Sequence, residues 1–240
     1  MTTIDLRRTH SLVAIPNLGS LGTSGNIAQP AKVALVSAVA AVPPITMLHL
    51  NATDAVDPAS WTISDYVVTL PFGIPLFGMT AAALAIGAGV LARGLVHSTG
   101  TRVLRGLLAV WAVALLVAAI FPTNLRGTPE NFSSNVHLYA GAVVFAALPA
   151  AGVLLARRQR RLTGRSAMTV ALTAISAVSA LLSTALILNR LPGVIGMPEL
   201  MLPPGILQRA AGAVEIVLLA VAAVTVLRSA HRSSSPAVTR

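Results

Sequence analysis

The sequence has 240 residues, of which 55% are hydrophobic and only 10% are charged, and its mean hydropathy is +0.80. An ordinary soluble domain is about 25% charged, so this composition argues against a soluble globular protein and against a disordered chain. There are no cysteines, which excludes disulfides, thiolate nucleophiles and cysteine-ligated metal centres. The formal net charge is +10, and its meaning depends on where the basic residues lie.

Six apolar segments are each long enough to cross a bilayer, which takes roughly 20 helical residues. They lie near residues 31–51, 70–92, 103–122, 136–156, 167–189 and 205–228. Residues 1–30 are polar, with several glycines, serines and asparagines, which predicts a flexible tail, and residues 229–240 form a second, shorter tail. The sequence therefore predicts an all-α integral membrane protein, a six-helix transmembrane bundle between two tails.

The basic residues divide unequally between the two sides of this bundle. The tails, and the loops on the same side as the tails, hold 14 of the 17 lysines and arginines. The acids favour the other side, in or beside its loops: Asp54, Asp57, Asp65, Glu130 and Glu199. The positive-inside rule then places both termini in the cytoplasm, in a multi-pass protein of the cell membrane. The basic excess is thus a topology signal, and nucleic acid is not an expected partner.

The varied polar residues gather in the outer loops, so we expect any functional site at the outer face. His137 opens the fourth span, and His49 lies near the outer end of the first. With Asp65 or Glu199 they have the ligand types of a metal site, but no closely spaced histidine motif supports one. The alternatives are histidines that hydrogen-bond neighbouring loops or that act as acid and base. The sequence gives no reason to expect a metal or another cofactor.

Ser64, Asp65 and His137 include the residue types of a serine hydrolase, but no Gly-x-Ser-x-Gly elbow accompanies them. Ser64 or Asp65 fits better as a helix cap, because either side chain can accept orphan N–H bonds before an apolar run. The neighbouring Trp61 and Tyr66 are expected to be interface aromatics. We still predict that Asp65, Arg126 and His137 approach one another at the outer mouth of the bundle.

Two features inside the spans carry further expectations. Pro43 and Pro44 lack N–H groups, which predicts a kink in the first span, either shaping an outer pocket or covered by neighbouring helices. Glu215 is the only carboxylate well inside a span, and helical spacing places it on one stripe with Gln208 and Gly212. We expect this stripe to face inward. Glu215 then acts either as a neutral packing group or as a proton donor.

Arg209 begins the sixth span nearer to the outer surface than Glu215. Its position predicts pairing with an acid of an outer loop.

Three stretches of the chain resemble a known family. They are DPASWTISDY at 57–66, AIFPTNLRGTPENFSSNVHLYAGAVVFAALPAAGVLLARR at 119–158 and PPGILQRAAGAVEIVLLAVA at 203–222. They are similar to the bacterial membrane family catalogued as domain of unknown function 998, over about residues 33–228. The resemblance implies six spans in the bacterial inner membrane and an outer polar cluster, but no activity. The chain has Asn124 and Asp65 where the family usually has aspartate and glutamate, which argues against a mechanism that needs a carboxylate at position 124.

Two functions remain open from the sequence. The first is an enzyme acting on a lipid or isoprenoid in an outer-face polar pocket, with His137, Asp65 and Glu215 as its catalytic residues. Its binding residues would be His49, Ser64, Arg126, Gln208 and Arg209. The second is a non-enzymatic membrane protein: a small-molecule permease, a lipid sensor or a partner subunit. Membrane lipids are the expected partners in both, and the oligomeric state is left open.

Overall fold

The computed structural model describes residues 25–52, 56–195 and 202–234. Its helices are α1 (Gly25–Ala40), α2 (Val42–Leu50), α3 (Ile63–Val67), α4 (Gly73–Gly94), α5 (Arg102–Ile120), α6 (Phe132–Thr163), α7 (Ala167–Ile195) and α8 (Pro204–Ser234). Within the described ranges, six helical segments are long and apolar enough to span a membrane, and α1 and α2 together form the first of them. The predicted all-α fold with six spans is therefore confirmed, and the chain is a multi-pass membrane protein.

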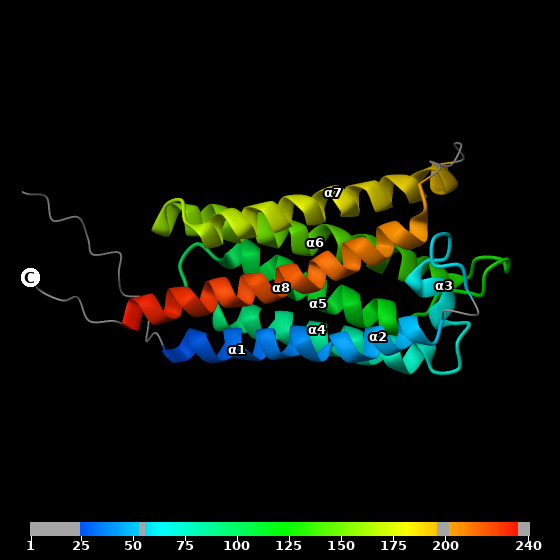
Figure 1. Ribbon diagram of the computed structural model, residues 1–240, viewed down its shortest axis with the longest axis horizontal. Helices are drawn as coiled ribbons and strands as arrows, with labels where there is room; N and C mark the ends of the chain where they lie inside the picture. Colours follow the sequence, from blue (N-terminus) through cyan, green and yellow to red (C-terminus); the bar gives the residue numbers. More distant parts are fainter. Residues whose placement is uncertain (1–24, 53–55, 196–201, 235–240) are drawn as a thin grey trace, which may run out of the picture.

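The long helices run side by side along one axis (Figure 1). From α4 to α8, each packs against the next in the chain, and α8 returns to pack along α1, which also packs against α4. α6 and α8 contact each other, and α7 packs against both of them on the periphery of the bundle. The short helix α3 lies at one end of the bundle, next to the start of α8.

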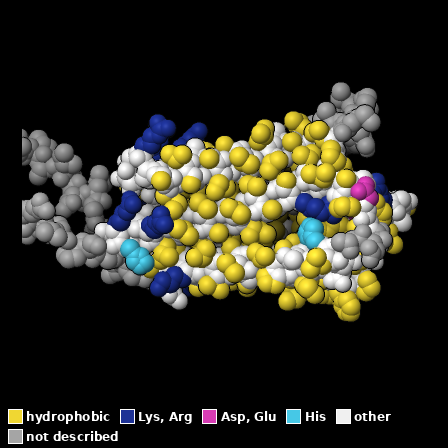
Figure 2. All heavy atoms as spheres, viewed as in Figure 1, with side chains coloured by type: hydrophobic (Ala, Val, Ile, Leu, Met, Phe, Trp, Pro, Cys, Tyr) yellow, Lys and Arg dark blue, Asp and Glu magenta, His cyan; other side chains and the backbone are white. Residues whose placement is uncertain are grey.

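The two ends of the bundle differ in charge. Lysines and arginines gather at the end that holds the start of α1, the connection between α6 and α7, and the end of α8 (Figure 2). We call this the basic end. The opposite end, which we call the polar end, holds α3, the start of α8 and the connection between α5 and α6 (Figure 1).

The N-terminal boundary differs from the expected one. α1 begins at Gly25, so residues 25–30 are helical and not part of a flexible tail. The reason is tertiary packing, because Ile27 packs against the main hydrophobic core and is stabilised there despite the polar residues around it. The rest of the predicted N-terminal tail, residues 1–24, lies outside the described residues.

Three other helices, α6, α7 and α8, are longer than the sequence predicts, and α7 continues to Ile195. α6 begins at Phe132, four residues early, because Asn131 and Ser134 form a capping box. The Asn131 side-chain oxygen accepts the Ser134 N–H at 2.9 Å, and the Ser134 hydroxyl lies 2.9 Å from the Asn131 nitrogen. α8 continues through Ser234 into the expected C-terminal tail, since the first proline after the span is Pro236.

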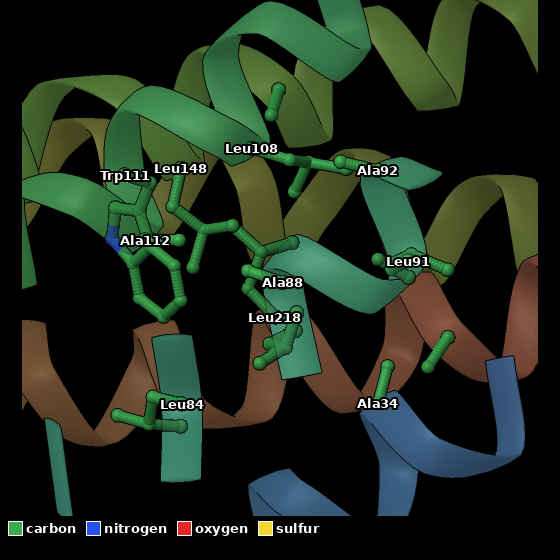
Figure 3. Close-up of a cluster of buried hydrophobic side chains, with 14 of the residues drawn as sticks. Ala34, Leu84, Ala88, Leu91, Ala92, Leu108, Trp111, Ala112, Leu148 and Leu218 are labelled. Carbon is green, nitrogen blue, oxygen red and sulfur yellow. The ribbon is translucent and has the colours of Figure 1, made fainter. Parts of the chain in front are cut away.

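The half of the bundle next to the basic end is closely packed. Fully buried leucines of α4, α6 and α8 meet there with alanines of α1, α4 and α5 between them (Figure 3). A Cβ atom added to Gly87 of α4 would lie 2.8 Å from the Ser37 Cβ of α1. Small residues thus let the helices approach closely, which is how helix packing is stabilised in a membrane.

The first span divides into two helices next to Pro43 and Pro44, which is the place where the sequence predicts a kink. The Ala41 N–H still reaches the Ser37 carbonyl at 3.1 Å, and α2 starts afresh at Val42. The prolines cannot donate to the carbonyls one turn earlier. α1 packs along α8, whereas α2 packs against α4 and not along α8. The interruption therefore separates α2 from α8 in the polar half of the bundle.

Candidate functional site

The polar half of the bundle contains a cavity of about 480 Å³. Its walls come from α2, α4, α5, α6 and α8, with residues of α3 at the polar end and none of α7. Most lining side chains are apolar. Apart from two threonines, the polar lining residues are His49, Ser64, Trp111, His137, Gln208 and Glu215. This mixture of apolar walls and a few polar groups is typical of a small-molecule binding site.

The cavity opens sideways, between α2 and α8. Val42 of α2 and Val217 of α8 both line it, yet their side chains are 45% and 50% exposed. Thr46 and Ala213, also in its lining, are exposed as well. Figure 2 shows the surface hollowed on this face, beside a histidine and a basic side chain. The rim residues belong to two candidate membrane-spanning segments, so the opening lies on the side of the bundle and not at either of its ends.

His137 is fixed by a carbonyl that a proline leaves without its helical partner. Pro122 has no N–H to donate to Ala118, four residues earlier at the end of α5. The His137 Nδ1 lies 2.8 Å from the Ala118 carbonyl oxygen and 2.9 Å from that of Phe121. Carbonyl oxygens only accept, so Nδ1 carries the proton and the lone pair of neutral His137 is on Nε2.

The Nε2 lone pair of His137 faces the hydroxyl of Ser64. The Ser64 Oγ lies 2.9 Å from it, across 73 positions of sequence, so the Ser64 hydroxyl donates to the imidazole. On the other side, the Gln208 Nε2 lies 3.5 Å from the same Oγ. The Gln208 side-chain oxygen accepts the Ile63 N–H, an orphan donor in the first turn of α3. Gln208 therefore holds the start of α3, and with it Ser64, against α8.

The first turn of α3 is capped by its neighbours, and Ser64 is left free to face His137. Thr62 is the N-cap, and the Asp65 carboxylate accepts the Thr62 N–H at 2.8 Å and the Thr62 hydroxyl at 2.7 Å. The capping interpretation is thus confirmed for Asp65 and wrong for Ser64. The difference arises because Thr62, one residue before the helix, supplies the N-cap.

Arg209 and Gly205 tie the same loop to the start of α8. The Arg209 guanidinium donates to the carbonyls of Pro58 at 2.6 Å and Trp61 at 2.8 Å. Among the described residues, backbone carbonyls and not an acid take the N–H groups of Arg209. Two of the outer-loop acids with which it is expected to pair, Asp54 and Glu199, lie outside the described residues. A Cβ on Gly205 would lie 2.3 Å from the Trp61 oxygen, so only glycine fits at this close approach.

The charge of Arg209 affects the pKa of one acid of this loop, Asp57. The Asp57 pKa is lowered chiefly by the Ser60 hydroxyl and by backbone N–H groups, and more weakly by Arg209. This effect is a small one at an exposed site, so it leaves the carbonyl contacts as the main function of the guanidinium.

His49 and Tyr66 form a second hydrogen-bonded pair beside the cavity. The His49 Nδ1 lies 2.6 Å from the Ile45 carbonyl, so its Nε2 accepts the Tyr66 hydroxyl at 3.0 Å. Tyr66 is 0% exposed and is not the interface aromatic that the sequence predicts. Burial raises its pKa to about 12, although the Arg209 guanidinium over its ring, 5.1 Å from the centroid, opposes the shift. The Tyr66 hydroxyl therefore remains protonated and can keep donating to His49.

Asp65 lies in the segment 61–65, and Arg126 and His137 contact this segment, but these contacts do not join the three side chains to one another. Arg126 lies over the Trp61 ring, 5.1 Å from its centroid, Asp65 binds Thr62, and His137 binds Ser64. The three side chains share the polar end but serve different contacts. Asn124 holds its own loop by donating to the carbonyls of Thr128 and Pro129, each at 2.9 Å.

The two histidines use their ring nitrogens in hydrogen bonds to protein groups. Both nitrogens of His137 and both of His49 have such partners. The expectation that each histidine forms hydrogen bonds is confirmed, but the partners lie mainly on helices and not on neighbouring loops. Of the carboxylates considered with them, Asp65 caps α3, and Glu199 lies outside the described residues.

The predicted inward stripe of α8 is confirmed, since Gln208, Gly212 and Glu215 all line the cavity. Trp111 lines it as well, although no motif marks this residue in the sequence. One property of the sequence could have indicated Trp111: an indole N–H near the middle of an apolar span needs a hydrogen-bond partner, as any polar group does in hydrocarbon.

Comparison with known proteins gives a family and no activity. Residues 34–225 match the model of the family described as "Protein of unknown function (DUF998)". No curated protein and no solved structure matches the chain. The matched residues include every cavity-lining side chain, from Val42 to Val217. The chain therefore belongs to the DUF998 family, whose name records a shared sequence and not a reaction.

Proposed function

We propose that this protein is a membrane enzyme that acts on a lipid or isoprenoid, taken from the bilayer through the opening between α2 and α8. The observation that carries the proposal is the 2.9 Å hydrogen bond from Ser64 to the unprotonated nitrogen of His137, at the end of an apolar cavity. A hydroxyl paired in this way with an oriented imidazole is the arrangement of an activated nucleophile.

The chemistry of the polar cluster favours an uncharged ester as the reacting group. The polar side chains at this end of the cavity are those of His49, Ser64, His137 and Gln208, and none of them carries a fixed charge. The Arg209 guanidinium is engaged by the loop carbonyls and the Tyr66 ring. A diphosphate would lose much of its hydration here without a cation in return, whereas an acyl ester needs only hydrogen bonds.

The proposed reaction is acyl transfer to Ser64. The Ser64 Oγ attacks the ester carbonyl carbon while its proton passes to the His137 Nε2. The Ala118 and Phe121 carbonyls, which accept from Nδ1, stabilise the imidazolium that forms. The Gln208 amide is the donor placed to bind the carbonyl oxygen as it gains charge. The leaving alkoxide then takes the proton from His137, and water releases the acyl group by the same steps.

The remaining predicted site residues have supporting functions in this proposal. Asp65 positions Ser64 by capping α3, and Arg209 and Arg126 hold the loop above the cavity. His49 fixes Tyr66 and lines the wall beside the reacting group. Glu215 lies deeper in the cavity and does not reach the ester.

A long-chain alkyl fluorophosphonate, which modifies activated serines, tests the proposal on the purified full chain in detergent. We expect labelling of the wild-type protein at Ser64, none of Ser64→Ala, and a loss of at least about 100-fold in labelling rate for His137→Asn. Ser133→Ala is the matched control, because the Ser133 hydroxyl bonds the Pro122 carbonyl outside the cavity. Label that persists in Ser64→Ala, or an unlabelled wild type, would overturn the enzyme proposal.

The non-enzymatic alternative is favoured by one observation, that the Asp65 carboxylate serves Thr62 and not His137. A photoreactive fatty acid methyl ester separates the two functions. Crosslinking within the cavity without cleavage of the ester, together with absent fluorophosphonate labelling, would indicate a lipid sensor, a permease or a partner subunit. Cleavage that depends on Ser64 would exclude these.

We also propose that the basic end is cytoplasmic, as the positive-inside rule requires. The polar end and the opening between α2 and α8 then belong to the outer half of a cell membrane. The chain has no cysteines, so single cysteines report cleanly. Ser133→Cys should react with an impermeant maleimide in intact cells and Thr163→Cys should not, and the reverse pattern would show the opposite orientation.

A further inference from the structure

Two polar side chains at the deep end of the cavity have unused hydrogen-bonding atoms. Glu215 is 3% exposed and Trp111 is 1% exposed, and both line the cavity. Considering the residues that the structure describes, neither the Glu215 Oε1 nor the Trp111 Nε1 has a hydrogen-bond partner. Buried polar groups are normally satisfied, because a buried group without a hydrogen bond loses its contacts with water and gains nothing in return. The two unused atoms thus indicate a group that is missing from the protein alone.

The chemistry of the two groups defines what would satisfy them. An indole N–H can only donate. A carboxyl group buried in a span and facing no cation is more stable as the neutral acid, which both donates and accepts. The two side chains lie close enough to interact, but the geometry of a hydrogen bond is not reached at the Glu215 Oε1 or the Trp111 Nε1. An uncharged oxygen, as in a hydroxyl or keto group, can accept from both donors at once.

From this geometry we infer that Trp111 and Glu215 form a second binding subsite, for an uncharged oxygen carried on the apolar chain of the ligand. The inference rests on the proposed function for the lipidic nature of that ligand. Glu215 lies seven residues after Gln208 on α8, or about 10 Å along the helix axis at 1.5 Å per residue. The ligand class is therefore a chain-oxygenated lipid, with a keto or hydroxyl group about 10 Å from its ester end.

The opposite ends of the cavity would then select different parts of one molecule. His137, Ser64 and Gln208 would receive the ester, and the apolar walls between α4, α5 and α8 would receive the chain. The deep oxygen subsite would discriminate between chains of equal length. Such discrimination is strong where the site hydrogen-bonds the ligand, because a ligand without the oxygen leaves both buried donors unpaired.

Fluorescence of Trp111 provides the test on the full chain. The protein has only two tryptophans, so Trp61→Phe leaves Trp111 as the sole reporter. Binding is measured for methyl palmitate and for methyl oxopalmitates that carry the keto group at successive chain positions. We expect one position to bind about tenfold more tightly than methyl palmitate. With a ¹³C label, its keto stretch should shift to lower frequency in the complex.

Variants separate the subsite from general cavity packing. Glu215→Gln keeps a donor and should keep most of the keto preference, whereas Glu215→Leu should remove it. Thr80→Val is the matched control, because Thr80 lines the cavity but already donates to the Leu76 carbonyl at 3.0 Å. If Glu215→Leu does not fold, the Trp111→Phe protein tests the same subsite. There the oxopalmitates compete with methyl palmitate for binding, and we expect the preference for the keto esters to be lost.

The outcomes distinguish this inference from the proposed function. If methyl palmitate and every oxopalmitate fail to bind, the lipid proposal itself fails. Binding of all the esters with equal affinity would leave the lipid proposal intact and overturn the oxygen subsite, with water as the partner of both donors. A keto preference that survives in both Glu215→Leu and Trp111→Phe would also overturn it.

Discussion

The two halves of the bundle are built from the same helices but packed in opposite ways. Near the basic end, α4, α6 and α8 bring Leu91, Leu148 and Leu218 together without room for a ligand (Figure 3). Near the polar end, the same helices surround a cavity of about 480 Å³. On α8 the change takes only three residues, from Glu215 to Leu218. The comparison shows that the same helices pack closely in one half of the bundle and enclose a cavity in the other.

The largest expected effect comes from the same substitution made in each half. A Cβ on Gly152 of α6 would meet the Ser176 hydroxyl and lie 3.0 Å from a Leu218 methyl, whereas a Cβ on Gly212 meets nothing within 4 Å. We expect Gly152→Leu to lose about 3 kcal/mol or more of stability through overpacking. Gly212→Leu should fold normally and fill part of the cavity. Thermal unfolding in detergent and binding of methyl palmitate measure the two effects.

Equal destabilisation by both substitutions would contradict the contrast between the halves. Gly152→Ala and Gly212→Ala are the graded controls, since each adds only the Cβ. The second should be neutral or slightly stabilising, because alanine is favoured over glycine inside a helix by up to about 1 kcal/mol.

The next effect concerns Tyr66, the buried hydroxyl of the polar half. An unfolded tyrosine loses its proton near pH 10, and folded Tyr66 does so near 12 because of burial. Between these values the unfolded state binds fewer protons, so stability falls as pH rises, by roughly 2–3 kcal/mol in all. Below pH 10 Tyr66 contributes no pH dependence. Tyr66→Phe should lose less stability over the same range.

Absorbance of tyrosinate checks this prediction directly. The chain has two tyrosines, and Tyr139 is exposed. In a Tyr139→Phe protein, the remaining absorbance change should have its midpoint near pH 12, and a midpoint near 10 would show that Tyr66 is not buried.

The sequence predicts the fold better than the site, and the difference has a physical cause. Spans follow from local hydropathy, and the stripe of Gln208, Gly212 and Glu215 follows from helical spacing alone, so both could be found. The pairing of Ser64 with His137 joins residues 73 positions apart. This pairing depends on the packing of α3 against α8, and no local sequence pattern predicts that packing. The same holds for Tyr66, whose aromatic ring fits an interface as well as a core.

Capping and cavity formation also depend on more than one segment. Ser64 and Asp65 both have cap-forming side chains, and only the position of Thr62 before the first turn decides between them. The proline pair predicts a kink in the first span. The opening between α2 and α8 requires in addition that α8 pack along α1 and not along α2. Pro122 and His137 are separately visible in the sequence. Their link, through the Ala118 carbonyl, appears only when α5 and α6 lie side by side.

A smaller effect separates the two functions of His137. His137→Ala leaves the Ala118 carbonyl without the donor that replaces Pro122, which should cost about 1–3 kcal/mol. His137→Asn can present an amide N–H near the position of Nδ1 and should recover much of this stability. Neither variant restores the base that faces Ser64. Stability that recovers while fluorophosphonate labelling stays low would confirm both functions, and unchanged stability in His137→Ala would contradict the structural one.

The smallest expected effect distinguishes the two arginines of the polar end. Arg126 is exposed and its contact is the Trp61 ring, 5.1 Å away, so Arg126→Ala should cost only about 0.5–1 kcal/mol. Arg209 also lies over an aromatic ring, but it donates to two loop carbonyls as well. Arg209→Ala should therefore be the more destabilising of the two and should slow labelling of Ser64, because the loop that carries α3 is released. Salt provides a further contrast: the exposed Arg126 contact should weaken at high ionic strength, and the partly buried contact of Arg209 with the Trp61 carbonyl should change little. Thermal unfolding of both variants at low and high salt measures this difference, and equal losses would mean that the carbonyl contacts of Arg209 do not hold the loop.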